Sequence, residues 1–213
     1  MSIDRGRAMK TINVASLTDE QPFCAGVILQ DSEHRLIATI NTTNRAGYYR
    51  IGGVGGGQEV GETVVQCAMR EALEEVGVAV RLKHSSTTYL HDLDTNNFMQ
   101  VQCEDELAPF LVQFRKNKHP HKPYREGLPC GAYTHYVLYL ADADLEGITP
   151  SSEVKGLIHV KREEWSILEQ GLTIRALQEK GVCIVARADV DEHFQVMVHE
   201  DESLRVIADF LST

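Results

Sequence analysis

The sequence lacks several features that would place a protein in a class at once. No run approaches the roughly 18 consecutive apolar residues of a membrane-spanning helix. The polar start MSIDRGRAMK has no apolar stretch behind it, which argues against a signal peptide. Five cysteines are an odd number without CxxC spacing, so neither a zinc site nor a disulfide framework is indicated. These absences favour a reducing, cytoplasmic compartment and no membrane partner.

Basic residues are scarce relative to acidic ones. The 213 residues carry a formal net charge of −10, with an ordinary 43% of hydrophobic residues. A surface that binds nucleic acid is normally basic, so we do not expect nucleic acid as a partner. The length and composition fit one large domain, or a domain with an extension, around a substantial core.

The most informative stretch is Gly55 to Val78, GGGQEVGETVVQCAMREALEEVGV, which begins with glycines and continues with a helical pattern. The spacings i, i+3 and i+4 place Glu71, Glu74 and Glu75 on one narrow face of a helix that is expected to end at Gly77. Six apolar residues fall on the opposite arc and are expected to be buried: Val65, Ala68, Met69, Ala72, Leu73 and Val76.

Three like charges on one helix face are unfavourable by themselves. Each pair at i,i+4 destabilises a helix by roughly 0.2–0.5 kcal/mol, and the helix dipole disfavours anions near the C-terminal end. A hard divalent cation such as Mg²⁺ or Mn²⁺ would relieve both penalties, because such ions prefer oxygen ligands. A solvated acidic face is the alternative interpretation of these carboxylates.

The glycines at 52–57 do not match two well-known phosphate loops. A P-loop requires Lys followed by Ser or Thr after the last glycine, and this chain has Gln58-Glu59. The dinucleotide fingerprint GxGxxG fails as well, because its third glycine position after Gly53 and Gly55 is Gln58. We still expect a loop here, whose backbone can approach a phosphate or a metal closely.

Gly56, Glu62 and the run REALEEVGV at 70–78 together resemble the signature of the Nudix hydrolases. Every glycine, glutamate and arginine of that signature is present at its spacing. Two positions differ: the aliphatic residue after the Arg-Glu pair is the small Ala72, and Val54 stands where the family usually has a proline. The resemblance implies an α/β fold, a Nudix-type α/β/α sandwich with a mixed β-sheet and a loop-helix-loop signature.

The resemblance covers roughly residues 22–170 and divides the chain. It implies a Nudix hydrolase domain over residues 1–170, in which 1–20 form a polar N-terminal arm or an added edge strand. Residues 171–213 are expected to be a C-terminal extension packed on the same domain, as a cap or as part of a homodimer interface.

Local patterns predict the other elements. Turn chemistry at 31–34 predicts a β-hairpin from Phe23–Gln30 and Arg35–Ile40, and residues 94–110 fit a strand, a helix or a loop. Prolines and polar residues predict an exposed basic loop over Arg115–Gly131. Further strands are expected at Tyr49–Ile51, Val78–Leu82, Thr87–Leu93, Ala132–Ala141, Gly156–Val160 and Val182–Ala186, and further helices at 163–170, 173–180 and 202–211.

The resemblance also implies a reaction: metal-dependent hydrolysis of a diphosphate bond in a small nucleoside diphosphate derivative, such as a nucleotide sugar or a nucleoside triphosphate. Glu62 and Arg70 would brace the loop and the helix without touching substrate. The Mg²⁺ or Mn²⁺ ion would be held by carboxylates and a glycine carbonyl: Glu71, Glu74, Glu75, and Gly55 or Gly56.

The general base is open between Glu75 on the helix and Glu153 in a later loop, with His91, Asp92 and Asp94 as weaker alternatives. Four basic residues are candidates for contacts with the substrate phosphates: Arg50, Lys116, Lys122 and Arg125. The basic loop is interpreted as a phosphate or nucleotide clamp over the metal site, and a solvated charged insertion is the competing interpretation.

Two other functions compete with hydrolysis. A nucleotide-sensing Nudix domain without turnover is one, but a pure binding module has no need for three crowded carboxylates. An isomerase or an mRNA-decapping enzyme on the same scaffold is the other. Decapping requires a long basic path for RNA, and only residues 115–125 offer one.

Overall fold

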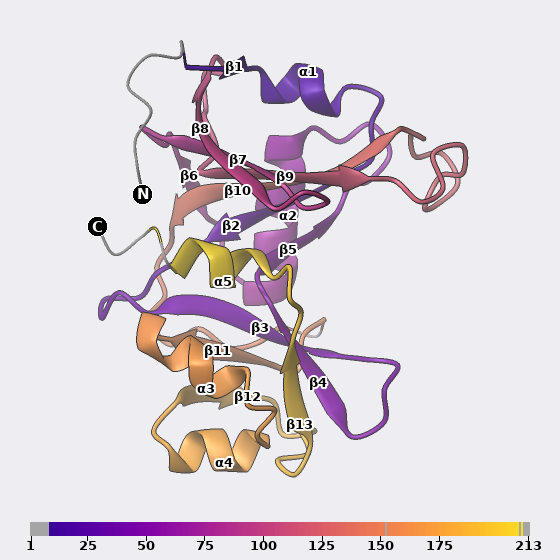
Figure 1. Cartoon of the computed structure of the whole chain (residues 1–213). Coiled ribbons are helices and arrows are strands. Elements are labelled where there is room, and N and C mark those ends of the chain that lie inside the picture. The colour runs from indigo at the N-terminus through magenta and orange to yellow at the C-terminus, as the bar shows by residue number, and fades with distance from the viewer. Residues whose placement is uncertain (1–8, 152, 209, 211–213) are drawn as a thin grey trace.

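The computed structural model describes residues 9–151, 153–208 and 210, which build two β-sheets with short helices (Figure 1). One sheet consists of β1 Thr11–Ile12, β2 Phe23–Ile28, β5 Val54–Gly57, β6 Arg81–Lys83, β7 Thr88–Asp92, β8 Asn97–Cys103, β9 Leu111–Lys116 and β10 Tyr133–Asp142. The other consists of β3 Leu36–Thr42, β4 Tyr48–Gly52, β11 Gly156–Val160, β12 Cys183–Ala186 and β13 Gln195–Val198. The helices are α1 Val14–Thr18, α2 Val64–Val76, η1 Arg162–Glu164, α3 Trp165–Leu168, α4 Ile174–Glu179 and α5 Ser203–Ala208.

Both sheets contain parallel and antiparallel pairs. The eight-stranded sheet has the order β1-β8-β7-β9-β10-β2-β5, with β6 paired to β10, and the five-stranded sheet has the order β12-β11-β3-β4-β13. The mixed α/β class expected from the resemblance is confirmed. No helix in the described part of the chain has the length and apolar character to cross a membrane.

Most elements expected from local patterns are present. The ambiguous stretch 94–110 contains strand β8, and β1 pairs with β8 as an added edge strand. Residues 1–8 of the expected arm lie outside the described residues, as does Leu211 of the expected last helix. The elements α1, β9 and β13 have no counterpart in the sequence prediction. Strand β9 includes Arg115 and Lys116, so the basic loop begins two residues later than predicted.

The predicted β-hairpin at 23–40 is wrong. Residues 31–34 do turn the chain, but β2 continues into the eight-stranded sheet and β3 into the five-stranded sheet. The two segments pair at one isolated bridge, between Gln30 and Leu36, and form no ladder in the described residues. The physical reason is that both are buried on both faces, so each is a central strand of its own sheet rather than half of a ribbon.

The predicted glycine loop is also partly wrong, because Gly55 to Gly57 lie in strand β5, antiparallel to β2. Gly26 of β2 stands opposite Gly55, and a Cβ added to Gly26 would lie 2.2 Å from the Val54 carbonyl oxygen. Glycine is therefore needed for the close approach of two backbones, as well as for any approach of a ligand.

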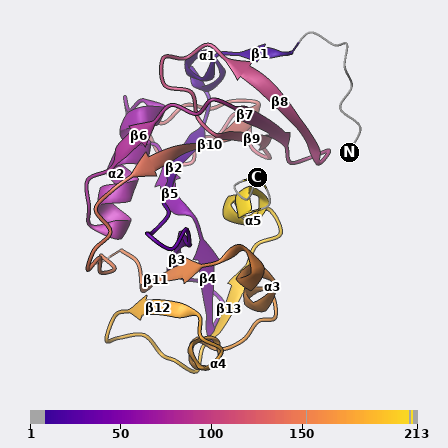
Figure 2. The same cartoon turned by 90° about the vertical axis from the view of Figure 1, so that its left-hand side faces the viewer.

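Helix α2 packs on one face of the eight-stranded sheet, beside β2 and β5 (Figure 2). It buries Glu71 and Glu75, which are only 9% and 8% exposed, whereas Met69 and Leu73 are 45% and 53% exposed. The predicted burial of Met69 and Leu73 is wrong. The helix is rotated so that its carboxylates face strand β5, because the glycines there leave room for them.

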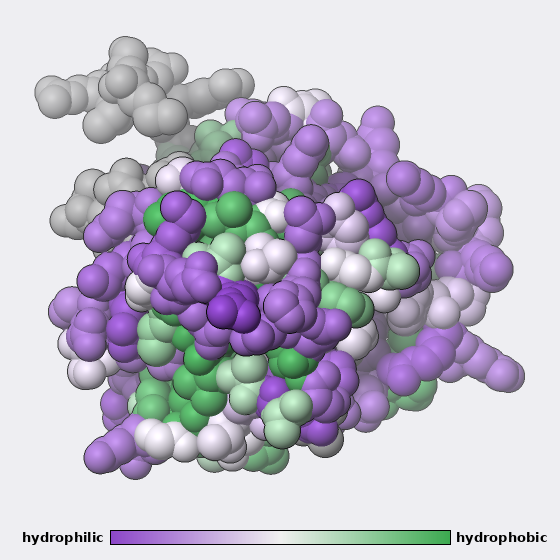
Figure 3. All heavy atoms as spheres, turned by 90° about the horizontal axis from the view of Figure 1, so that it is seen from below, coloured by the Kyte–Doolittle hydropathy of each residue, from purple (hydrophilic) through white to green (hydrophobic). Residues whose placement is uncertain are grey.

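The C-terminal elements complete the second sheet. β12 pairs with β11 and β13 pairs with β4, while α5 lies between the two sheets (Figure 1). Leu168, Leu177 and Leu204 belong to the core cluster on this side. Hydrophobic side chains also gather on the face seen from below in Figure 3.

A domain boundary at residue 170 stays a prediction.

The half-buried carboxylate of Asp31 joins the turn between β2 and β3 to strand β11. Asp31 Oδ1 accepts hydrogen bonds from the backbone of Glu33 and Arg35, and Oδ2 lies 2.7 Å from Arg35 Nε and 2.8 Å from His159 Nδ1 on β11. Burial acts to raise the pKa of Asp31, but the hydrogen bonds from His159 and Arg35 outweigh it and lower the pKa to about 2.

Asp31→Asn is expected to flatten the acid dependence of stability. An unfolded Asp31 protonates near pH 3.8, and the folded one near pH 2. Its stabilisation is therefore present above the first value and is lost as the pH falls toward the second. Between about pH 5 and pH 2.5, the free energy of unfolding, measured with urea, should fall by on the order of 1 kcal/mol more in wild type than in the variant.

Asp19→Asn is the matched control, because Asp19 is exposed and its side chain has no hydrogen bond within the described residues. If the free energy of unfolding fell equally with pH in wild type and in Asp31→Asn, this role of Asp31 would be contradicted.

Candidate active site

Helix α2 begins and ends at defined local signals. Thr63 caps the N-terminus: its Oγ1 accepts a hydrogen bond from Gln66 N at 3.2 Å, and Gln66 Oε1 accepts one from Thr63 N at 2.9 Å. Gly77 ends the helix in a left-handed conformation, with φ of 75°, and its N–H donates to the Leu73 carbonyl. These caps fix where Glu71, Glu74 and Glu75 lie along the helix.

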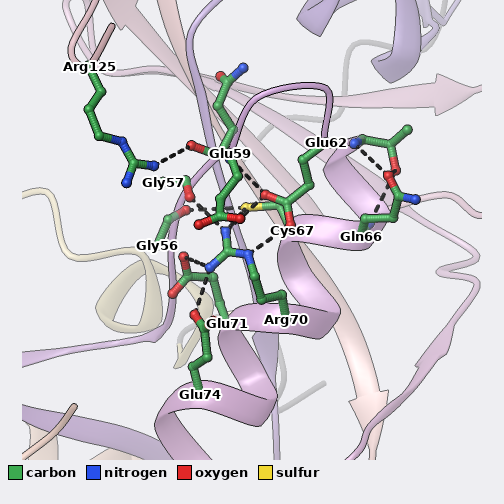
Figure 4. Close-up of polar contacts among 12 residues, drawn as sticks. Gly56, Gly57, Glu59, Glu62, Gln66, Cys67, Arg70, Glu71, Glu74 and Arg125 are labelled. Atoms are coloured by element: carbon green, nitrogen blue, oxygen red, sulfur yellow. Dashed lines mark hydrogen bonds and ion pairs between the residues drawn. The ribbon is translucent and has the colours of Figure 1, made fainter. Parts of the chain in front are cut away.

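Arg70 is the centre of the polar contacts in Figure 4. Its guanidinium donates from Nε and Nη2 to the two carboxylate oxygens of Glu62, at 2.8 and 2.9 Å. Nη1 donates to Glu71 and to Glu74, both at 2.7 Å, and Nη2 also donates to the Gly57 carbonyl at 2.9 Å. Hydrogen bonds from Arg70 lower the pKa of Glu62. The guanidinium thus joins strand β5, the turn after it and the helix.

Glu75 points away from this cluster, toward the start of strand β5. Its Oε2 accepts a hydrogen bond from Gly55 N at 2.8 Å. Burial raises the pKa of Glu75 to about 8, against the lowering effect of that hydrogen bond, and the charge of Glu71 raises it further. Burial also raises the pKa of Glu71. The two carboxyls resist being charged together unless positive charge is added.

Gly56 lies directly against the Glu71 carboxyl group. A Cβ added to Gly56 would lie 2.4–2.6 Å from the carboxyl atoms of Glu71. The Gly56 carbonyl accepts a weak hydrogen bond from Cys67 Sγ at 3.6 Å. The absence of a side chain at position 56 therefore sets the position of Glu71.

The last turn of α2 positions Glu153. Ser151 N donates to the Glu75 carbonyl at 3.2 Å, and Ser151 Oγ donates to the Glu74 carbonyl, so free helix carbonyls are satisfied. Glu153 N lies 3.3 Å from Ser151 Oγ. The charge of Glu153 raises the pKa of Glu71 and of Glu75, so the structure brings this predicted residue to the cluster.

A cavity of about 860 Å³ opens between the helix and the basic loop at 117–132. Glu71, Glu74 and Glu153 lie on its acidic side, and Lys122 and Arg125 on the side of the loop. The loop is closed at its base by a hydrogen bond from Asn117 N to the Ala132 carbonyl, and Arg125 Nη2 donates to the Gln58 carbonyl at 3.3 Å. The predicted clamp over the metal site would come from this loop, and its role as a clamp stays a prediction.

Other predicted residues do not line this cavity. Lys116 is exposed at the end of β9, where its N–H donates to Asp94. His91 lies on β7 and is buried, with its ring nitrogens in contact with the side chains of Gln113 and Asn96. Asp92 and Asp94 accept hydrogen bonds in the turn that follows.

Arg50 is exposed and does not line the cavity either, but its charge lowers the pKa of Glu75. Of the four predicted phosphate contacts, only Lys122 and Arg125 lie at the cavity.

The donor chemistry here fits a hard divalent cation: the carboxylates of Glu71, Glu74 and Glu75 and the carbonyl of Gly56. Within the described residues, no group of three His, Cys, Asp or Glu side chains is arranged to hold a metal ion. Arg70 forms ion pairs with two of these carboxylates, Glu71 and Glu74. A cation must therefore compete with the guanidinium for these two carboxylates.

Sequence reasoning missed three residues at the site. Gln58 is buried and its Oε1 accepts a hydrogen bond from Phe23 N at 2.5 Å, which joins β2 to the end of β5. Cys67 is a buried thiol against Gly56, and burial raises its pKa to about 12. Glu202 contacts Gly53 from 149 positions away, a separation that no local pattern signals.

Gly56→Ala is expected to displace the Glu71 carboxylate and weaken metal binding roughly 10-fold or more, since the added Cβ would overlap the carboxyl atoms. The affinity for Mn²⁺, measured by electron paramagnetic resonance, tests this. Gly57→Ala is the matched control, because a Cβ there has no atom within 4 Å. Equal Mn²⁺ affinity for both variants and wild type would refute it.

Known proteins of similar structure share little sequence with the chain. The solution structure of the E. coli ORF135 protein is 16% identical, with 73% of this chain and 77% of that one covered and a TM-score of 0.41. A crystal structure of a NUDIX hydrolase from Nitrosomonas europaea is also 16% identical, with a TM-score of 0.37. It covers 64% of this chain, which spans 55% of that protein. The curated proteins contain no match.

A family profile gives a more direct result. The profile described as NUDIX domain matches residues 21–170, which is well over half of the sequence. The matched region contains α2, the Arg70 cluster and the basic loop at the cavity. The chain belongs to the Nudix family.

Proposed function

We propose that this protein hydrolyses a diphosphate bond in a nucleoside diphosphate derivative and depends on a divalent metal ion, Mg²⁺ or Mn²⁺. Nudix hydrolases as a family cleave such bonds and generally use divalent ions. The observation that carries the proposal for this chain is the cavity, which is lined by Glu71 and Glu74 of the signature and by Lys122 and Arg125 of the basic loop.

The size and charge of the cavity support a substrate of this class. A volume of about 860 Å³ lies within the range of small-molecule sites and accommodates a nucleotide-sized ligand. A diphosphate is strongly anionic, so it requires added positive charge near Glu71 and Glu74 and cations on the other side. Lys122 and Arg125 are placed to supply the latter.

The residues that would hold the ion are Glu71, Glu74 and Glu75, with the Gly56 carbonyl. A bound divalent cation supplies positive charge that stabilises the developing charge on the diphosphate. Arg70, braced by Glu62, would orient Glu71 and Glu74.

Glu153 is the carboxylate that we assign to accept the proton from the attacking water. It lines the cavity, and its side chain has no hydrogen bond or ion pair within the described residues. Glu75, by contrast, already accepts a hydrogen bond from Gly55. Reach to the proton decides such a role, and Glu153 faces the open space of the cavity.

Glu74→Gln is expected to lower kcat by about 100-fold or more while the protein stays folded, because a charged oxygen ligand is lost. Release of phosphate from a panel of nucleoside diphosphate derivatives, with Mg²⁺ and with Mn²⁺, measures this.

Glu179→Gln is the matched control, on the exposed surface of α4. Unchanged turnover in Glu74→Gln would refute the proposal. Tight nucleotide binding by wild type without product in excess Mg²⁺ would favour the nucleotide-sensing alternative instead.

Lys122→Ala is expected to raise KM roughly 10-fold with little change in kcat, because it removes one charge-assisted contact to a substrate phosphate. Steady-state kinetics on the best substrate of the panel test this. Lys118→Ala is the control, since Lys118 is exposed in the same loop but does not line the cavity. Equal KM values for the two variants would show that the loop is a solvated insertion.

A further inference from the structure

We propose that Glu202, in the segment just before α5, is a positioning residue for Glu75. It fixes the backbone at Gly53, and thereby the N–H of Gly55 that binds the Glu75 carboxylate. This inference rests on the proposed function, because it concerns the same site. It assigns a role to the C-terminal segment, which lies outside the region matched by the family profile.

The contact between Glu202 and the signature segment is direct. Glu202 Oε1 accepts a hydrogen bond from Gly53 N at 3.0 Å, and lies 3.3 Å from Leu204 N. Thr39 Oγ1 shares its one hydrogen between the Gly52 carbonyl, at 3.1 Å, and the Gly53 carbonyl, at 3.3 Å. The N–H and the carbonyl of Gly53 are therefore both restrained by hydrogen bonds to side chains.

The constraint continues along the strand to the carboxylate. Val54 is fully buried and pairs with Val27 of β2. The next residue, Gly55, donates its N–H to Glu75 Oε2 at 2.8 Å. Within three residues the backbone meets two carboxylates, Glu202 from the C-terminal segment and Glu75 from α2, so a shift at one is transmitted to the other.

Glu202 is itself held in place by its neighbours. Asp201 forms an ion pair with Arg115, and Ser203 Oγ donates to Gln113 Oε1, both on β9. Gln113 is buried and its Nε2 lies 3.0 Å from His91 Nδ1. The segment is thus fixed to the eight-stranded sheet.

The preceding strand fixes it to the other sheet, because β13 pairs with β4. The C-terminal segment therefore spans the junction between the sheets, where the chain passes from β4 to β5.

A carboxylate at this junction is energetically demanding. Burial raises the pKa of Glu202, against the hydrogen bonds from Leu204 and Gly53 and the charge of Arg50, which lower it. Such a group is tolerated only where hydrogen bonds compensate the loss of water. The charge of Arg50 also lowers the pKa of Glu75, so this exposed cation acts on both carboxylates.

This arrangement also bears on Val54, which stands where Nudix signatures usually have a proline. A proline would restrict φ at that position. In this chain the backbone at 53–55 is instead restrained from outside, by Glu202 and Thr39, and by the burial of Val54. We therefore expect the segment to become mobile when the contact from Glu202 is removed.

The test compares Glu202→Ala and Glu202→Gln in the full chain. Amide hydrogen exchange at Gly53 and Gly55, followed by NMR, reports the backbone, and electron paramagnetic resonance reports Mn²⁺ affinity. Glu202→Ala should increase exchange at both amides and weaken Mn²⁺ binding, each by roughly 10-fold. Glu202→Gln should stay close to wild type in amide exchange and in Mn²⁺ affinity, because its amide oxygen can accept the hydrogen bond from Gly53 N.

Glu200→Ala is the matched control, since Glu200 is exposed and its side chain has no hydrogen bond within the described residues. If Glu202→Ala does not fold, Glu202→Asp takes its place: it keeps the charge but is one methylene too short to reach Gly53. Unchanged exchange at Gly55 and unchanged Mn²⁺ affinity in the folded variant would overturn the proposal. So would a Glu202→Gln variant as impaired as Glu202→Ala, because charge alone would then explain the effect.

The two proposals fail in distinguishable ways. A wild-type protein that binds no Mn²⁺ and releases no phosphate contradicts the proposed function, and hydrogen exchange at Gly55 then still shows whether Glu202 restrains the backbone. Normal turnover in wild type with no response to Glu202→Ala contradicts only the positioning role.

Discussion

The structure around the candidate site depends on one cation among carboxylates. Arg70 donates to Glu62, Glu71 and Glu74 and to the Gly57 carbonyl. Like charges this close would repel one another, and removing them from water adds a further cost. A planar guanidinium with five donors in a fixed fork can satisfy several acceptors at once, which an ammonium group cannot do. The turn at 58–63, strand β5 and helix α2 are therefore held in one arrangement by a single side chain.

The same cluster leaves the site with an excess of carboxyl groups over cationic side chains. Arg70 bonds to Glu71 and Glu74, whereas the burial of Glu75 is only partly offset, by one backbone N–H and by the charge of Arg50. Glu153 adds further negative charge. More carboxyl groups gather here than Arg70 can neutralise, and an added divalent ion would complete the balance.

Two segments distant in sequence contact the signature region. The basic loop places Lys122 and Arg125 across a cavity from the glutamates, although the chain as a whole is strongly acidic. The C-terminal segment reaches the other side of the signature strand, where Glu202 binds Gly53. Strand pairing positions both segments. The loop connects β9 to β10, which pair with each other, and Glu202 follows β13, which pairs with β4.

The sequence by itself determined the parts of the site that lie close along the chain. The spacing of Glu71, Glu74 and Glu75, the end of the helix at Gly77 and the family signature all lie in one stretch of about 24 residues. Helix periodicity and local signals therefore suffice to predict them. The α/β class followed from that same resemblance.

Only the tertiary structure decided what faces that stretch. The rotation of α2 exposes Met69 and Leu73 and buries Glu71 and Glu75, because the neighbouring strand lacks side chains at Gly55 and Gly56. Three further features depend on pairings between residues far apart in sequence. They are the divergence of β2 and β3 into two sheets, the position of the basic loop and the contact from Glu202. Local propensity does not encode such pairings, since they are selected by burial and hydrogen bonding over the whole fold.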